Sequence, residues 1–155
     1  MITIYCKKIS PRFQYVVRLI FNEVLMIDYS VFNNIELFEN SVGIKINYSD
    51  EPINNTIHIK PSGLMDEHKV AQKFIKHGTW NNIPVLFNTN TSPIPFDIFS
   101  AVFYMVSRYE EYLQFVPDKH GRFEAEESIA SNRKFLHLPV VDLWCKMFAE
   151  ELDIY

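Results

Sequence analysis

"MITIYCKKISPRFQYVVRLIFNEVL", residues 1–25, sets a short apolar segment directly before an amphipathic one. Residues 2–6 predict a strand, and the segment after them predicts a helix with Ser10 as its N-cap and Pro11 at its first position. The apolar residues of this helix recur at the i, i+3, i+4 spacing of one buried face: Phe13, Val16, Val17, Ile20, Phe21 and Val24. The chain therefore begins as a strand followed by a helix that packs on a core.

Further strand patterns follow. "GIKINYSD" (43–50) and "TIHIKP" (56–61) alternate apolar with polar residues, as strands with one solvated face do, and "EPINN" between them predicts a turn. "MIDYSVF" (26–32) is a further candidate strand, and "IPVLF" (83–87) is typical of a strand covered on both faces. Residues 66–75 fit either a helix or a long connection.

Two helices are expected in the second half, one over residues 95–113 and one over 139–152. The last helix carries one apolar face that must dock on something: Val140, Val141, Trp144, Met147, Phe148 and Leu152. Strands that alternate with helices predict an α/β fold, a mixed sheet of about five strands packed by helices. A chain of 155 residues is the size of one compact domain, so we expect a single domain over residues 1–155.

Charge and composition exclude several classes of function. The 19 acidic and 15 basic residues give a net charge of -4 and form no basic run that could follow a phosphate backbone, so we expect no nucleic-acid partner. No apolar run approaches the roughly 20 residues of a membrane span, and the first residues lack the features of a secretory signal. A cytoplasmic protein without a membrane partner is the expectation. Cys6 and Cys145 lie in apolar segments and are predicted to be reduced, structural thiols.

The stretch "SRYEEYLQFVPDKHGRF", residues 107–123, concentrates charged residues as an active site does. At about 100° per residue, a helix continued to Leu113 places Glu110 within its apolar face, and places Arg108 and Glu111 on the polar side near Tyr104. Neighbouring residues on a helix point in different directions, so the two glutamates are not expected to act as a carboxylate pair.

Glu110 has two interpretations. A carboxylate in apolar surroundings raises its pKa or finds a cation, and Arg122 and Arg133 are the candidate partners. Glu110 is then either a tuned acid or base, or an anchor that holds the following loop on the helix. Structural ion pairs also perturb carboxylates, so we favour the anchor.

"PDKHGRF" (117–123) reads first as a turn, in which Pro117 fixes φ, Asp118 bonds the backbone ahead and Gly121 permits a positive φ. Asp118 and His120 would also suit a metal, but the five histidines are scattered and no ligand spacing completes a set. We predict no metal, no cofactor and no catalytic residue. The residues expected to form a structural clasp are Arg108, Glu110, Glu111, Asp118, His120, Arg122 and Arg133.

The segments "PFDIFSAVFYMVSRYEEYL", "DKHGRF", "EESIA" and "FLHLPVVDLW" together resemble an uncharacterised bacterial domain found N-terminal to a polysaccharide-deacetylase-like (NodB-type) domain. "RLIFNEVL" and "INYSDEP" fit the same pattern, so the resemblance extends over nearly the whole chain. It implies an accessory domain without its enzyme. The Asp pair and the H-x-x-x-H segment expected of NodB-type deacetylases do not occur here, so no catalytic residue is transferred.

Two hypotheses follow. In the first, the chain is a noncatalytic accessory or interaction domain whose partner is a deacetylase-like domain, with carbohydrate as a further candidate partner. Exposed apolar surface on the last helix would then be the docking patch. In the second, the chain is a metal-dependent hydrolase or nuclease that uses Asp97, Glu110 or Asp118.

Overall fold

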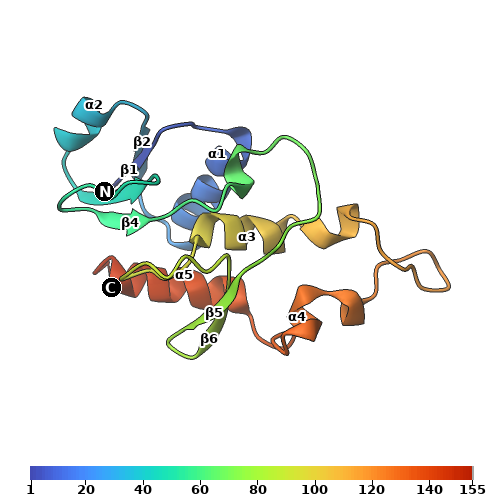
Figure 1. Cartoon of the computed structure of the whole chain (residues 1–155). Helices are drawn as coiled ribbons and strands as arrows, with labels where there is room; N and C mark the ends of the chain where they lie inside the picture. The colour runs from blue at the N-terminus through green and yellow to red at the C-terminus, as the bar shows by residue number, and fades with distance from the viewer. Residues whose placement is uncertain (155) are drawn as a thin grey trace.

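The first strand of the sequence lies inside a four-stranded parallel sheet in the computed structural model, which describes residues 1–154. The order of the strands is β2-β1-β3-β4, and β1 pairs in parallel with both of its neighbours. The bounds are β1 Ile2–Cys6, β2 Tyr29–Phe32, β3 Ile44–Tyr48 and β4 Ile57–Ile59. Because all four strands run the same way, their carboxyl ends meet at one edge of the sheet (Figure 1).

The helix after β1 forms as the sequence predicts. It comprises α1, Pro11–Arg18, and a π-helical turn, η1, Leu19–Val24. The Ser10 side chain accepts a hydrogen bond from Phe13 N–H at 3.1 Å, and Pro11 occupies the first position. Five of the six predicted apolar side chains are fully buried and Val24 is half-buried, and α1 packs against the later helix α3, Ile98–Val106.

The two faces of the sheet are covered differently. Ile2, Ile4 and Cys6 of β1 point into the main core with α1. Tyr5 points to the other face, where its ring lies 5.6 Å from that of Phe38 in the short helix α2, Ile35–Glu39. That second layer is thin, as Figure 1 shows, and it leaves part of the face open toward the carboxyl ends of the strands.

A separate antiparallel hairpin pairs β5, His77–Trp80, with β6, Ile83–Leu86. Asn81 and Asn82 between them both adopt positive φ, 47° and 65°, as a two-residue hairpin turn of the favoured twist requires. Only β6 was predicted, because the polar residues of β5 hide its pattern. The strands therefore divide into a parallel sheet and a hairpin, whereas the sequence predicted one mixed sheet of about five strands.

The last helix, α5, Val140–Glu151, is buried within this chain. Trp144 is fully buried, its indole N–H donates to the Pro84 carbonyl of β6 at 2.9 Å, and its ring lies 5.6 Å from Phe96. Phe148 packs against Phe21 and Phe99. The apolar face predicted for this helix therefore has its partner inside the domain, and the docking patch expected on the helix is wrong.

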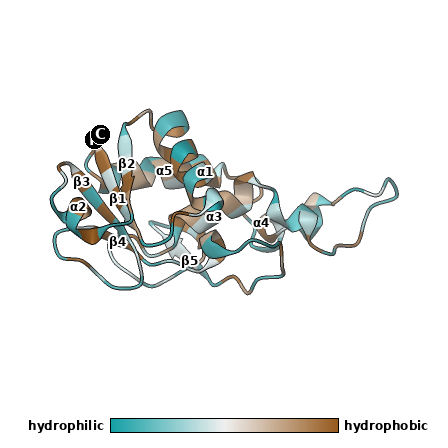
Figure 2. Ribbon diagram, turned by 90° about the horizontal axis from the view of Figure 1, so that it is seen from above, coloured by the Kyte–Doolittle hydropathy of each residue, from teal (hydrophilic) through white to brown (hydrophobic). Residues whose placement is uncertain are grey.

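After α3 the chain leaves the body of the domain. It forms a 3₁₀ turn, η3, Tyr109–Tyr112, then an extended segment, a second 3₁₀ turn, η4, Ala125–Glu127, and the short helix α4, Ile129–Asn132. We name residues 113–124 the arm; in Figures 1 and 2 it projects away from the rest of the molecule. The α/β fold and the single domain are confirmed.

Two local expectations change. The strands β3 and β4 run parallel, so the "EPINN" turn lies within a connection that returns along the sheet before β4 begins. Residues 66–75 form no helix; a 3₁₀ turn, η2, Leu64–Asp66, precedes an irregular connection. Within residues 1–154, none of the helices combines the length and the apolar composition that a bilayer span requires.

Candidate functional site

The charged stretch 107–123 does not continue the helix before it. The helix α3 ends at Val106, and Arg108 adopts a positive φ of 53°, which a continuing helix does not allow. Helical faces calculated through Leu113 therefore do not apply. Tyr104, placed on the polar side by that calculation, is buried and stacks on Tyr109 with ring centroids 5.1 Å apart.

Glu110 bonds to backbone. Its two carboxylate oxygens accept from the Ile129 N–H at 2.9 and 3.2 Å, which joins the end of α3 to the beginning of α4. Burial raises the pKa of Glu110, and the Ile129 hydrogen bond opposes that rise in part. Neither Arg122 nor Arg133 pairs with it within the described residues, so the predicted arginine partner is wrong.

Asp118 stabilises a turn within the arm through hydrogen bonds to residues of that same turn. Its carboxylate accepts from the backbone N–H groups of His120 and Arg122 at 2.8 and 2.9 Å, and from the Arg122 side chain at 3.0 and 3.1 Å. These bonds, led by that of the Arg122 backbone, lower the pKa of Asp118. The rings of Phe115 and Phe123 meet edge to face at 5.3 Å across the arm. The arm is thus held by contacts between its own residues.

The remaining candidate residues of this region form fewer side-chain hydrogen bonds and ion pairs with the rest of the chain. Arg108 and Glu111 pair with each other at 2.5 Å, and Arg108 is mostly exposed. His120 contributes its backbone N–H. Arg133 forms no ion pair or side-chain hydrogen bond within residues 1–154, although its charge, after burial, helps to lower the pKa of His77. The structure does not bring the seven candidates together into one site.

Asp97 is the most deeply buried acid of the chain. It is the N-cap of α3, where its Oδ1 accepts from Ser100 N–H at 3.1 Å. Its Oδ2 accepts from the Tyr48 hydroxyl at 3.0 Å, from Ser62 N–H at 2.8 Å, and from the hydroxyls of Ser62 and Ser100 at 2.9 and 2.6 Å. Burial raises the pKa of Asp97, while the Ser100 and Ser62 bonds act against that rise. The hydrogen bonds of Asp97 therefore link α3 to β3 and to the loop after β4.

The acids and thiols do not form a metal or nucleophile site in the described chain. No three His, Cys, Asp or Glu side chains within residues 1–154 lie close enough to share a metal ion. Both cysteines are buried free thiols whose pKa burial raises to about 12, and Cys6 Sγ donates to the Lys8 carbonyl at 3.1 Å. A thiol that stays protonated at neutral pH is a poor nucleophile.

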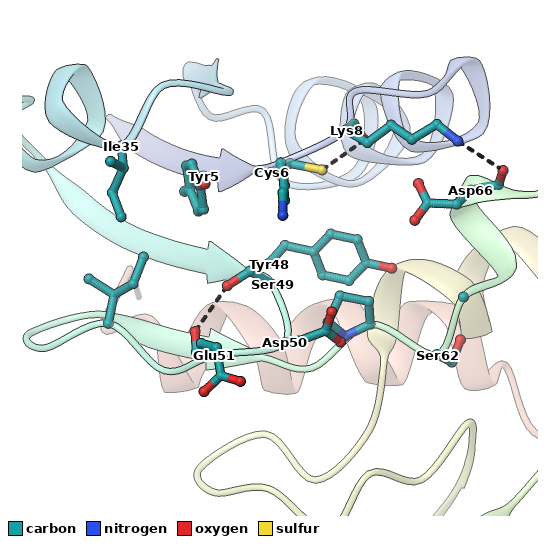
Figure 3. A pocket seen from close by; sticks show the side chains of 14 residues that line it. Tyr5, Cys6, Lys8, Ile35, Tyr48, Ser49, Asp50, Glu51, Ser62 and Asp66 are labelled. Atoms are coloured by element: carbon teal, nitrogen blue, oxygen red, sulfur yellow. Dashed lines mark hydrogen bonds between the residues drawn. The ribbon is translucent and has the colours of Figure 1, made fainter.

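A large pocket lies at the carboxyl edge of the parallel sheet. Its volume is about 960 Å³, and it opens between the loops that follow β1, β3 and β4, with α2 at one side (Figure 3). Apolar side chains of Tyr5, Ile35 and Ile53 line it together with charged side chains. The charged residues are Lys7 and Lys8 after β1, Asp50 and Glu51 after β3, and Asp66 in η2.

None of these pocket residues was among the candidates predicted from the sequence, although the sequence holds a signal for them. Lys7 directly follows the predicted strand 2–6, Asp50 is the last residue of the predicted strand segment 43–50, and Glu51 directly follows that segment. In parallel sheets, residues after the carboxyl ends of neighbouring strands gather where ligands bind. The alternating pattern did not reveal that the strands were parallel, so the loops could not be placed together.

Several large apolar side chains outside α5 are exposed. Tyr112 and Val116, at the base of the arm and within it, are 73% and 74% exposed, and Phe74 in the connection before β5 is 94% exposed. That connection touches the same region, because Ala71 N–H and C=O both bond to the Tyr109 hydroxyl. Large apolar side chains are therefore exposed around η3 and the arm, and also elsewhere in the chain, at Met26, Leu37 and Val42.

Comparison with known proteins identifies one family. Searches against curated proteins and against solved structures find no match. A family of unknown function, DUF7033, matches residues 2–154, which is nearly the whole of the chain and includes the sheet, the pocket and the arm. The chain therefore belongs to the family of unknown function DUF7033.

Proposed function

We propose that this chain is a noncatalytic accessory domain that packs against a polysaccharide-deacetylase-like domain. The proposal draws on the resemblance of its second half, "PFDIFSAVFYMVSRYEEYL" to "FLHLPVVDLW", to the domain that precedes NodB-type deacetylases. It is compatible with membership of a family to which no activity is assigned.

The use of the acids supports a noncatalytic role. Asp97, Glu110 and Asp118 were the residues assigned to a hydrolase or nuclease, and each accepts hydrogen bonds from neighbouring backbone. Asp97 lies at 0% exposure, out of reach of a substrate. A carboxylate whose oxygens are taken by backbone donors stabilises the fold and has little capacity left to move a proton.

The observation that carries the interaction role is the exposed apolar surface of the arm. Tyr112 and Val116 are largely exposed, yet the arm between residues 113 and 124 is ordered by the Asp118 turn and the Phe115 and Phe123 contact. A segment that is already ordered loses little conformational entropy when it binds. Exposed apolar side chains on such a segment are typical of protein-protein contact sites.

The test is association in solution with a NodB-type deacetylase domain encoded in the same genome. The two purified proteins are mixed, and complex formation is measured by analytical ultracentrifugation. The unmodified chain should form a one-to-one complex. A double variant, Tyr112→Ser with Val116→Ser, should bind at least about tenfold more weakly, because it removes the apolar contact.

Leu37→Ser is the matched control. Leu37 is 61% exposed on α2, at the opposite end of the molecule from the arm (Figure 1), so this variant should bind as the unmodified chain does. Absence of any complex, or equal binding by the arm variant and the unmodified chain, would contradict the proposal.

A further inference from the structure

The pocket at the carboxyl edge lies where the chain changes direction across the sheet. From β1 the chain passes to β2 on one side, and it then returns to β3 on the other side of β1. The loops that leave β1 and β3 therefore diverge, and they leave a crevice between them. In open parallel sheets this crevice is the usual place for a ligand. Its volume of about 960 Å³ is at the upper end of the range for small-molecule pockets.

The helix that begins beside this crevice, α1, lacks the features with which a helix N-terminus binds phosphate. In folds of this kind, phosphate binds free N–H groups at the first turn of the helix after β1, usually beside a glycine-rich loop. Here the connection of residues 7–10 contains no glycine, and Pro11 has no N–H. Ser10 Oγ accepts from Phe13 N–H and donates to the Met65 carbonyl at 2.5 Å, and its own carbonyl accepts from Gln14 N–H.

The charged side chains around the crevice are of both signs and remain available. Lys7, Asp50 and Glu51 are exposed, and their charged groups form no ion pair or side-chain hydrogen bond within residues 1–154. Lys8 reaches only the Asp66 carbonyl, at 3.4 Å. Figure 3 shows Lys8 beside Asp66 on one side of the pocket, and Asp50 and Glu51 on the side of the loop after β3. With two lysines and three acids in the lining, the pocket has no excess of positive charge that would favour an anion.

The apolar side chains that line the pocket indicate that a suitable ligand also has an apolar face. Tyr5 is held in place by its contact with Phe38, and Ile35 and Ile53 add apolar surface to the lining. A suitable ligand therefore has an apolar face and several groups that both donate to carboxylates and accept from ammonium groups. Hydroxyl groups do both. A sugar ring combines C–H faces with such hydroxyls and carries no charge.

We propose that this pocket binds a neutral sugar unit of a glycan. The ring would pack on Tyr5, its hydroxyls would donate to Asp50 and Glu51, and Lys7 and Lys8 would donate to its oxygens. The proposal rests on the pocket alone and is independent of docking through the arm.

The test is a titration of the whole chain followed by two-dimensional amide NMR, with four probes. Cellohexaose and chitohexaose are the neutral glycans, and inorganic phosphate and ATP are the anions that bind at this position in related architectures. At least one glycan should shift the amide signals of residues 6–8, 49–51 and 53 in a saturable way. Phosphate and ATP should not shift them.

Paired variants separate the pocket from the rest of the chain. Asp50→Asn with Glu51→Gln should weaken glycan binding about tenfold or more while the spectrum stays that of a folded protein, because two hydroxyl acceptors lose their charge. The matched control is Glu126→Gln with Glu127→Gln, two exposed glutamates beside the arm, which should bind normally. Three results would each overturn the proposal: no shift with either glycan, shifts with phosphate or ATP alone, or equal binding by the pocket variant and the control.

Discussion

Two groups of carboxylates in this chain are used in opposite ways. Asp97, Glu110 and Asp118, the bonded set, each accept hydrogen bonds from backbone N–H groups, which belong to another segment for Asp97 and Glu110 and to its own turn for Asp118. Asp50 and Glu51, the free set, lie at the carboxyl edge of the sheet, and their carboxylates have no partner within residues 1–154. The stretch that is most crowded with charge is therefore structural, whereas the free acids are in an ordinary strand-to-loop segment.

The difference follows from what happens to each acid on folding. A carboxylate in the interior must be hydrogen-bonded, or its desolvation would cost several kcal/mol, on the order of the stability of a domain. A carboxylate on an open loop stays solvated at no cost, so it can be kept for a ligand. The density of charge along the sequence does not distinguish a hydrogen-bonded carboxylate from a free one. Only the hydrogen-bond partners of each carboxylate in the folded chain do.

The largest expected effect is at the deepest member of the bonded set. Asp97→Ala should lower the free energy of unfolding by about 3 to 5 kcal/mol, because it leaves the buried donors of Tyr48 and Ser100 without an acceptor, breaks the bonds to Ser62 and removes the cap of α3. Asp50→Ala, from the free set, should change it by no more than about 0.5 kcal/mol. Urea unfolding followed by circular dichroism measures both. Equal losses of stability for the two substitutions would contradict the distinction between the bonded set and the free set.

A smaller effect is expected in how the stability of the chain depends on pH. Burial raises the pKa of Asp97, so the folded chain binds this proton more tightly than the unfolded chain does. Ionisation of Asp97 therefore opposes folding. As pH rises from the ordinary carboxyl range, about 4, the unmodified chain should lose stability relative to Asp97→Asn by up to about 1.4 kcal/mol per pH unit.

The relative loss should end once pH exceeds the raised pKa. Unfolding of both proteins at a series of pH values gives this difference directly, and the contribution of Glu110, which is present in both, cancels. A difference that is constant over the whole acidic range, or that grows in the opposite direction, would show that Asp97 is not destabilised by burial.

The smallest effect is expected in the arm. Asp118 is half-buried, and its bonds stay within one turn, so Asp118→Ala should leave the global unfolding transition unchanged. The loss should be local, as faster hydrogen exchange at the amides of His120 and Arg122, which then have no acceptor. Lys119→Ala, exposed on the same turn, is the control and should leave both amides protected. A large fall in global stability would mean that the arm supports the core.

Much of the architecture could be predicted from local sequence. The strand 2–6, the cap at Ser10, the helix after it and the helix from Val140 are set by apolar spacing and by residues whose preferences act locally. The hairpin of β5 and β6 was only half predicted. Its Asn81 and Asn82 turn is a local signal, but the polar strand before it carries little apolar pattern.

The errors have a common physical origin, because they depend on contacts between distant segments. The break of α3 at Arg108 occurs in a sequence with good helical spacing, and it allows Glu110 to reach Ile129 nineteen positions away. The parallel pairing of β3 and β4 is also a long-range property. Without it, Lys7 and Asp50 could not be placed at the same edge of the sheet.

The most direct test of the distinction between bonded and free acids compares Glu110→Ala with Glu51→Ala by urea unfolding at neutral pH. Both residues are glutamates in irregular or 3₁₀ segments, but only Glu110 accepts a hydrogen bond through its side chain, from Ile129. The account predicts a loss of about 1 to 2 kcal/mol for Glu110→Ala and no more than about 0.5 kcal/mol for Glu51→Ala. The reverse order, or no loss for Glu110→Ala, would contradict it.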